Sequence, residues 1–200
     1  MSKVANTPSA TGPWTLTTER IVIAGVLAAI TIILGIVPGL GFIPIPNISG
    51  HATTEHIPTI LGGVLAGPLV GIISGLIFGI TSYFVATVPF FKDPLVSILP
   101  RLFIGLVAWA VFAGLARFNR DVAAAVAGFA GSATNTVLVL TMLVVRGYIP
   151  AVAIIPIIPQ SVIEAIIAAI LTVILARAFY ILRGRVVRAP DTKPREQQPY

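Results

Sequence analysis

The stretch that decides the fold is residues 57–91, which read IPTILGGVLAGPLVGIISGLIFGITSYFVATVPFF and contain no charged side chain. As one straight helix this stretch would be about 52 Å long, whereas the hydrocarbon core of a bilayer is about 30 Å thick. The helix must therefore break, and Gly67-Pro68 is the natural break because glycine and proline interrupt regular helices. We predict a short helix over residues 53–66 and a membrane-spanning helix over residues 69–87.

The composition of the whole chain agrees with a membrane protein. Of its 200 residues 56% are hydrophobic and 10% are charged, and the mean hydropathy is +1.00. A soluble domain carries about 25% charged residues. The deficit excludes a soluble enzyme, a nucleic-acid binder and a disordered chain. The absence of cysteine excludes a disulfide framework, a thiolate nucleophile and a Cys-ligated metal.

The other apolar runs, cut at helix breakers, predict four more helices. They are expected over residues 19–37, 94–118 with a kink at Pro100, 121–146 and 160–182. Pro/Gly-rich loops over residues 38–50 and 150–159 connect them on the outer side. We thus expect an all-α integral membrane protein with a six-helix domain over residues 16–188, and disordered cytoplasmic segments over residues 1–15 and 189–200.

Charge distribution predicts the orientation. With the N-terminus inside, ten of the thirteen Lys and Arg residues lie on the cytoplasmic side, as the positive-inside rule requires. Both termini are then cytoplasmic, and the net charge of +6 reflects orientation rather than nucleic-acid binding. We expect no secretory signal peptide, because the first apolar stretch begins only after about twenty residues.

The first candidate site lies where the short helix begins. Since this helix cannot cross the bilayer alone, we expect its outer end to lie below the surface and to line a cavity. A metal site would use His51, Glu55 and His56, but His56 points away from the other two on a helix, and we predict no metal site. The alternatives are a solvated loop or ligand contact, and we carry His56 and Asn47 as candidate ligand contacts.

The second candidate is Arg101, which lies about 10 Å along the helix that begins at Pro94. A guanidinium at this depth needs a partner. Asp93 and Glu164 are the candidate carboxylates, and either pair would hold helices together. The third possibility is a ligand carboxylate, which suits the planar donor fork of arginine.

The third candidate group is polar and lies on the last two helices. Asn135 is expected at mid-membrane on a face of small residues, where it makes either an interhelical hydrogen bond or a ligand contact. Gln160 and Glu164 are one turn apart. Together with Arg101 they could converge on one outward-facing polar pocket, and Tyr83 is a candidate wall residue unless it is an interfacial anchor.

Catalytic motifs are missing from the sequence. There is no Gly-x-x-x-x-Gly-Lys-Ser/Thr loop, no Gly-x-Ser-x-Gly motif and no His-Glu-x-x-His motif. We therefore expect a non-catalytic protein that binds or passes a polar solute.

Three strings resemble the substrate-binding S components of energy-coupling factor (ECF) transporters. They are HIPTILGGVLAGP at residues 56–68, DPLVSILPRLFIG at residues 93–105 and GSATNTVLVL at residues 131–140. The resemblance covers about Leu16 to Arg183. It is strongest to the pantothenate-type members, through the second string and the Thr-Asn-Thr of the third.

The resemblance implies a multi-pass protein of a prokaryotic cell membrane that captures a vitamin from outside. Such subunits work with a transmembrane coupling subunit and two cytoplasmic ATPases, so ATP is used by the partners and no cofactor is expected in this chain. The family contacts its coupling subunit through an Ala-x-x-x-Ala motif, which Ala24 and Ala28 match, with Gly25 and Ala29 one position along. Small residues at this spacing permit close helix packing, although they also arise by chance in an Ala/Gly-rich helix.

Alternatives remain open at the level of sequence. The chain could be an independent solute carrier or channel, or a membrane-embedded enzyme or structural subunit. Within the family, the ligand could be a hydroxymethylpyrimidine, folate or riboflavin in place of pantothenate.

Overall fold

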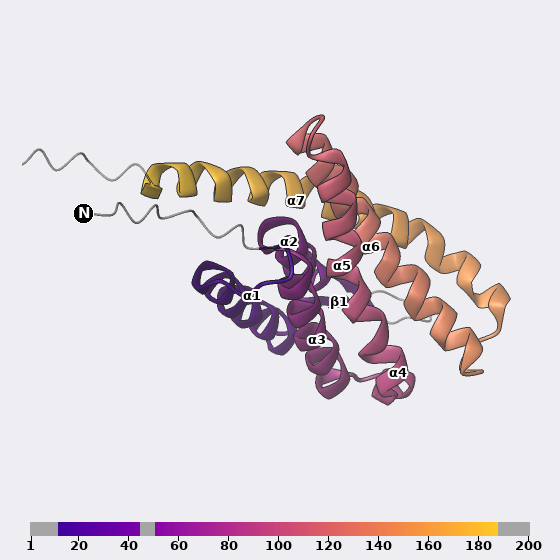
Figure 1. The fold of residues 1–200 in the computed structure, drawn as a ribbon. Coiled ribbons are helices and arrows are strands. Elements are labelled where there is room, and N and C mark those ends of the chain that lie inside the picture. Colours follow the sequence, from indigo (N-terminus) through magenta and orange to yellow (C-terminus); the bar gives the residue numbers. More distant parts are fainter. Residues whose placement is uncertain (1–11, 45–50, 188–200) are drawn as a thin grey trace, which may run out of the picture.

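The computed structural model describes residues 12–44 and 51–187, whose helices form one bundle (Figure 1). The main helices are α1 (Thr18–Ile36), α2 (His56–Ala66), α3 (Pro68–Val85), α5 (Leu99–Leu115), α6 (Arg120–Val145) and α7 (Ile158–Val187). Shorter elements are β1 (Phe42–Pro44), β2 (His51–Thr53), the 3-10 helices η1 (Pro89–Lys92) and η2 (Ala151–Ile157), and α4 (Pro94–Ser97). Five helical segments of the described residues are long and apolar enough to cross a membrane, and α2 is the short sixth helix. The predicted all-α, six-helix architecture is confirmed.

The break at Gly67-Pro68 is present. Gly67 adopts a φ of +100°, which favours glycine, and Pro68 opens α3. The short helix starts at His56 instead of the predicted residue 53, because residues 51–53 form β2 and pair antiparallel with β1. Backbone pairing across this hairpin, not visible in local sequence, delays the start of α2.

Helix α2 spans only part of the bundle. Its 11 residues are about 16 Å long at 1.5 Å per residue. At the C-terminal end of α2, Gly67 lies beside the backbone of Pro13 and the guanidinium of Arg20, near the start of α1. The first residues of α2 therefore lie inside the bundle, well short of its other end, as predicted from the length of the helix. The β1–β2 hairpin directly precedes these residues.

The predicted helix over residues 94–118 is in fact two helices. It divides at Ile98 into α4 and α5, because Pro100 has no backbone N–H to continue the hydrogen-bond ladder. It also ends at Leu115, three residues early. There Asn119 caps the next helix by accepting hydrogen bonds from the N–H groups of Asp121 and Val122.

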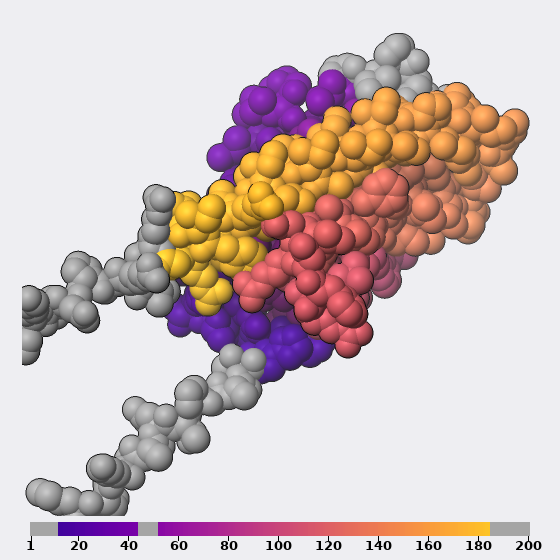
Figure 2. All heavy atoms as spheres, turned by 90° about the horizontal axis from the view of Figure 1, so that it is seen from above, coloured from indigo at the N-terminus to yellow at the C-terminus, as the bar shows by residue number. Residues whose placement is uncertain are grey.

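The prediction of an irregular loop over residues 150–159 is also wrong. The chain forms η2 and passes directly into α7. Proline is tolerated in the first turn of a helix, where its missing N–H has no intrahelical partner. Helix α7 therefore begins at Ile158 and runs along one side of the molecule (Figure 2).

Two ion pairs show which helix ends meet. Arg183 near the end of α7 pairs with Glu19 at the start of α1, and Arg177 of α7 pairs with Asp121 at the start of α6. We call this end of the bundle the inner end and the opposite one the outer end. At the same end, Arg20 lies in the first turn of α1, Arg117 follows α5 and Arg120 begins α6. The basic residues therefore gather at the end that the positive-inside rule assigns to the cytoplasm.

Most of the two predicted disordered segments lies outside the described residues. The exception is residues 12–15, which form a turn against the bundle. Arg20 donates hydrogen bonds to the carbonyls of Gly12, Pro13 and Thr15. Trp14 packs edge-on against Trp109 with ring centres 5.8 Å apart.

Helices α2, α3 and α5 pack through glycine. A side-chain carbon added at Gly105 of α5 would lie 2.4 Å from the Cα of Gly71 in α3, and one at Gly75 would lie 2.1 Å from the carbonyl oxygen of Arg101. Such close backbone contact is typical of membrane helices. It fixes the rotation of α5 relative to α3 and thereby the direction of Arg101.

Candidate functional site

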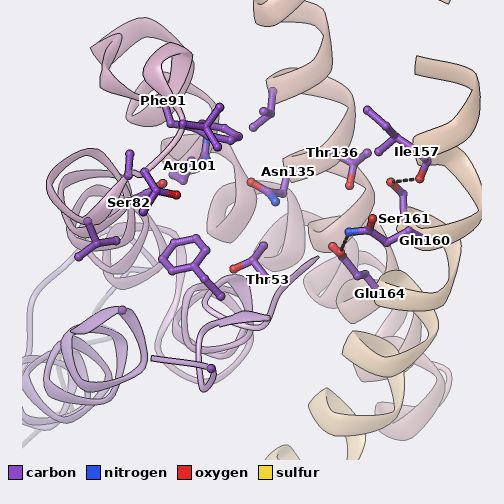
Figure 3. Close-up of a pocket in the computed structure, with 18 of the residues that line it drawn as sticks. Thr53, Ser82, Phe91, Arg101, Asn135, Thr136, Ile157, Gln160, Ser161 and Glu164 are labelled. Atoms are coloured by element: carbon purple, nitrogen blue, oxygen red, sulfur yellow. Dashed lines mark hydrogen bonds between the residues drawn. The ribbon is translucent and has the colours of Figure 1, made fainter. Parts of the chain in front are cut away.

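A cavity of about 340 Å³ opens at the outer end of the bundle. It lies between the ends of α1 and α3, the β1–β2 hairpin, and the outer turns of α5, α6 and α7. Its polar lining residues are Thr53, Ser82, Thr87, Arg101, Asn135, Thr136, Gln160, Ser161 and Glu164, most of which Figure 3 draws as sticks. Four predicted site residues, Arg101, Asn135, Gln160 and Glu164, are thus brought together in one cavity.

Arg101 is the buried cation of this cavity. Only 3% of its surface is exposed. Its Nη1 donates to the carbonyl oxygen of Val96 at 2.5 Å, and its guanidinium carbon lies 5.2 Å and 5.7 Å from the ring centres of Phe78 and Phe91. Its Nε has no hydrogen-bond partner among the described residues. The side chain is therefore held by an acceptor and two aromatic faces, with a donor left for another group.

Neither carboxylate that we predicted as a partner of Arg101 pairs with it. Asp93 accepts hydrogen bonds from Arg146 at 2.8 Å and from Tyr148 at 3.1 Å. Glu164 accepts one from Gln160 at 2.6 Å. Among the described residues, no carboxylate oxygen lies within ion-pair distance of the Arg101 guanidinium.

Asp93 instead clamps the segment that carries Phe91. Desolvation alone raises the pKa of Asp93, but hydrogen bonds from the Leu95 N–H, Arg146 and Tyr148 outweigh it and hold the pKa below its usual value. The Asp93 carboxylate therefore stays ionised at neutral pH and keeps its ion pair. On the other side, Lys92 donates to the carbonyls at the end of α3. Both contacts fix η1 above the cavity.

Asn135 lies on the face of α6 that carries small residues. Added side-chain carbons at Gly128 and Gly131 would lie within 3 Å of α7 and of Ile60 in α2, so α6 packs closely on both helices. Asn135 lies one turn further and reaches the cavity, where Figure 3 shows it between Arg101 and the α7 residues. Its Oδ1 has no partner among the described residues.

Gln160, Ser161 and Glu164 of α7 form the opposite wall (Figure 3). Glu164 accepts from Gln160 and from the backbone of Thr53 in β2. These contacts tie α7 to the hairpin and leave half-buried polar groups facing Arg101 and Asn135 across the cavity. The cavity can therefore bind a small solute with an anionic end and hydrogen-bonding groups.

The family comparison agrees with this arrangement. The family model described as ECF transporter, substrate-specific component, matches residues 19–176, which is most of the chain. The chain belongs to this family. No curated protein sequence matches it. This S component is thus the substrate-specific subunit of a membrane transporter and is itself a multi-pass membrane protein. Its family consists of transport proteins and not of enzymes, and its members work with coupling and ATPase subunits.

Two sequence candidates of the S component do not line its cavity. Tyr83 packs against Phe84 and Lys92. It follows Ser82 on α3, and because successive residues of a helix point in different directions, Ser82 lines the cavity and Tyr83 does not. His56 is fully buried beside Glu55 at the start of α2 and does not line the cavity. Asn47 lies outside the described residues.

Sequence reasoning missed several lining residues. Gly35 to Gly39 at the end of α1, Phe42 and Thr53 of the hairpin, and Phe91 all contribute to the wall. These residues are apolar or belong to the connections between helices, so their types do not indicate a binding role. The one sequence feature that could have indicated them is the shortness of α2, because the connection from α1 to α2 must then enter the bundle.

The predicted coupling motif lies on the face of α1 that points away from the other helices. Gly25 and Ala29 are exposed, Ala24 and Ala28 are half-buried, and no atom lies within 4 Å of a side-chain carbon added at Gly25. Leu27 and Thr31 face the core instead. The S component therefore presents a surface of small residues to which another helix can pack closely.

Proposed function

We propose that this S component captures a small vitamin carboxylate, with pantothenate as the best candidate, from the outer side of a prokaryotic cell membrane. It delivers the vitamin inward together with a transmembrane coupling subunit and two cytoplasmic ATPases. The observation that carries this proposal is the buried guanidinium of Arg101 in the wall of the outer cavity.

Arg101 suits a carboxylate ligand. A guanidinium binds carboxylates through charge-assisted hydrogen bonds, which are stronger than neutral ones. The Nε of Arg101 has no partner within the described ranges. Since Phe78 and Phe91 flank the guanidinium carbon, a carboxylate would meet it in a largely apolar setting where the attraction is strong.

The remaining polar residues suit the other groups of pantothenate, which are two hydroxyls and an amide. The carboxylate of Glu164 accepts hydrogen bonds from hydroxyls, and the amide of Asn135 both donates and accepts. Both line the same cavity as Arg101, on different helices. A ligand with an anionic end and hydroxyls at the other end would satisfy all three.

The volume of the cavity favours a small vitamin. Ligand pockets usually measure about 300–1,000 Å³, and this one is near the lower limit at about 340 Å³. Folate and riboflavin, with their fused rings, fit it less well than pantothenate. A hydroxymethylpyrimidine is small enough, but it has no carboxylate for Arg101.

We assign ATP hydrolysis to the partner subunits and no cofactor to this chain. The exposed small-residue face of α1 supports an S component that docks on a coupling subunit. An independent carrier would instead support uptake without any ATPase, so uptake in cells that lack the ATPases separates the two functions.

The decisive experiment is a calorimetric titration of the purified chain with pantothenate, a hydroxymethylpyrimidine, folate and riboflavin. We expect saturable binding of pantothenate alone. Saturable binding of another vitamin without pantothenate binding would refute the ligand assignment and keep the family. A second titration with a pantothenate analogue that lacks the carboxylate tests Arg101 directly, because affinity should then be largely lost.

A further inference from the structure

A second cavity, open to the surface, lies at the inner end of the bundle. It is formed by the end of α5, the start of α6 and the inner part of α7, and its volume is about 470 Å³. Figure 1 shows the connection from α5 to α6 beside α7 at this place. We call this cavity the inner groove, and its lining residues are Phe112, Ala116, Arg120, Tyr180, Arg183 and Gly184. It is separate from the cavity that holds Arg101, which lies at the outer end.

Arg120 gives the inner groove a positive charge that no described carboxylate neutralises. Its guanidinium carbon lies 5.6 Å from the ring centre of Tyr180, and this cation–π contact holds the side chain against α7. Within residues 12–44 and 51–187, no acidic side chain forms an ion pair with Arg120. Its neighbour Asp121 accepts hydrogen bonds from Arg177 on both oxygens, at 2.7 Å and 2.5 Å. The N–H groups of Arg120 are therefore available for an anion.

Arg183 adds a second cation to the inner groove. Its Nη2 donates to Glu19 of α1 at 3.1 Å, but about half of each side chain is exposed. An ion pair in contact with water is weak, so Glu19 does not cancel the attraction of Arg183 for another anion. The described inner end carries more arginines than carboxylates, with Arg20, Arg117, Arg120, Arg177 and Arg183 against Glu19 and Asp121.

The inner groove lies at the level of the lipid headgroups. Helix α7 has 30 residues and is about 45 Å long, whereas the hydrocarbon core is about 30 Å thick. Arg177 and Arg183 are exposed, and exposed arginines do not lie in hydrocarbon, so the last turns of α7 lie at the inner membrane surface. Ile181 and Leu182 on the same turns are also exposed. Charged and apolar side chains thus surround the groove together.

We propose that the inner groove binds the phosphate headgroup of an anionic phospholipid of the inner leaflet, such as phosphatidylglycerol. Arg120 and Arg183 donate charge-assisted hydrogen bonds to the phosphate, and Tyr180 holds Arg120 in position. Basic pockets between membrane helices on the cytoplasmic side suit such headgroups. The apolar side chains of Phe112 and Ala116 in the groove favour a lipid over a soluble anion, because they contact its glycerol and the first carbons of its chains.

The test is native mass spectrometry of the full-length chain in detergent, titrated with phosphatidylglycerol or with phosphatidylcholine of the same acyl chains. The wild type should bind phosphatidylglycerol at least about tenfold more tightly, and Arg120→Ala should lose at least about tenfold of this affinity. The matched control is Arg117→Ala, which removes an exposed arginine at the same end that does not line the groove. This variant should bind phosphatidylglycerol as the wild type does.

Three results would overturn the inference. Equal wild-type affinity for the two lipids would exclude a site for anionic headgroups. Equal losses in Arg120→Ala and Arg117→Ala would show a general attraction to basic residues and no groove. Displacement of phosphatidylglycerol by an equal concentration of glycerol 3-phosphate would assign the groove to a soluble anion.

The wild-type comparison does not depend on whether a variant folds. The lipid titration also needs no vitamin, so its outcome is independent of the proposed function. Since Arg120 lies at the opposite end of the bundle from the outer cavity, Arg120→Ala should bind the vitamin with unchanged affinity. Loss of vitamin binding by this variant would show a structural role of Arg120 and would likewise overturn the inference.

Discussion

The side chain of Arg101 occupies the hydrogen-bond acceptor that Pro100 leaves unused. In a continuous helix the N–H of residue 100 would bond to the carbonyl of Val96, but proline has no N–H. The Nη1 of Arg101 donates to this carbonyl at 2.5 Å instead. A helix interruption thus holds the guanidinium at the wall of the cavity.

Replacement of Pro100 should loosen this arrangement. Pro100→Ala restores an N–H that competes for the Val96 carbonyl, so Arg101 loses its fixed position. We expect about two- to tenfold weaker vitamin binding, because Arg101 is displaced rather than removed, with unchanged or higher thermal stability. Titration and thermal unfolding measure the two effects. Unchanged affinity would show that the Val96 contact does not position Arg101.

Removal of Arg101 should have a larger effect. Arg101→Ala deletes the charge that meets the ligand carboxylate, and we expect at least about tenfold weaker binding, since a hydrogen bond to a charged group contributes about 1.5–3 kcal/mol. The control is Arg117→Ala, which removes an exposed arginine at the inner end and should leave affinity unchanged. Equal affinities of both variants would contradict the assignment of an anionic ligand.

The glycine contact between α3 and α5 should be essential for stability. Gly105→Ala places a carbon 2.4 Å from the Cα of Gly71, where the backbone of both helices must move, and overpacking of this kind costs about 1–3 kcal/mol. Gly114→Ala is the control on the same helix, since nothing lies within 4 Å of its added carbon. Thermal unfolding in detergent should show a lower midpoint for the first variant only.

Substitution on the exposed face of α1 should separate binding from assembly. Gly25→Leu adds a side chain where no atom of the chain lies within 4 Å, so vitamin affinity should be unchanged. It should, however, prevent close packing of the coupling subunit and abolish co-purification with the ATPase complex. Gly114→Leu, equally free of contacts on α5, should still assemble. Full assembly of the Gly25 variant would place the coupling surface elsewhere.

The helices were predictable because bilayer thickness imposes a length on each of them. The stretch over residues 57–91 had to break, and it breaks at Gly67-Pro68. The starts and ends of helices were less predictable. The β1–β2 pairing delays α2 to His56, and the loss of the N–H at Pro100 separates α4 from α5.

The candidate pocket was predictable in part. Arg101, Asn135, Gln160 and Glu164 converge, because polar side chains in apolar helices at a common depth tend to face one another. Tyr83 and His56 do not line the cavity, since their directions depend on helix rotation. Their roles as ligand contacts, like that of Asn47, stay predictions.

By itself, the sequence determined that this is a membrane protein of six helices, one too short to cross, with a few polar residues away from the helix ends. These properties follow from composition and from the lengths of apolar runs, which are local. Only the tertiary structure decided that Asp93 pairs with Arg146 and Glu164 with Gln160 rather than with Arg101, and that the hairpin enters the wall of the cavity. The reason is that such pairings depend on the rotation and depth of whole helices. Contacts between glycines far apart in the chain set both.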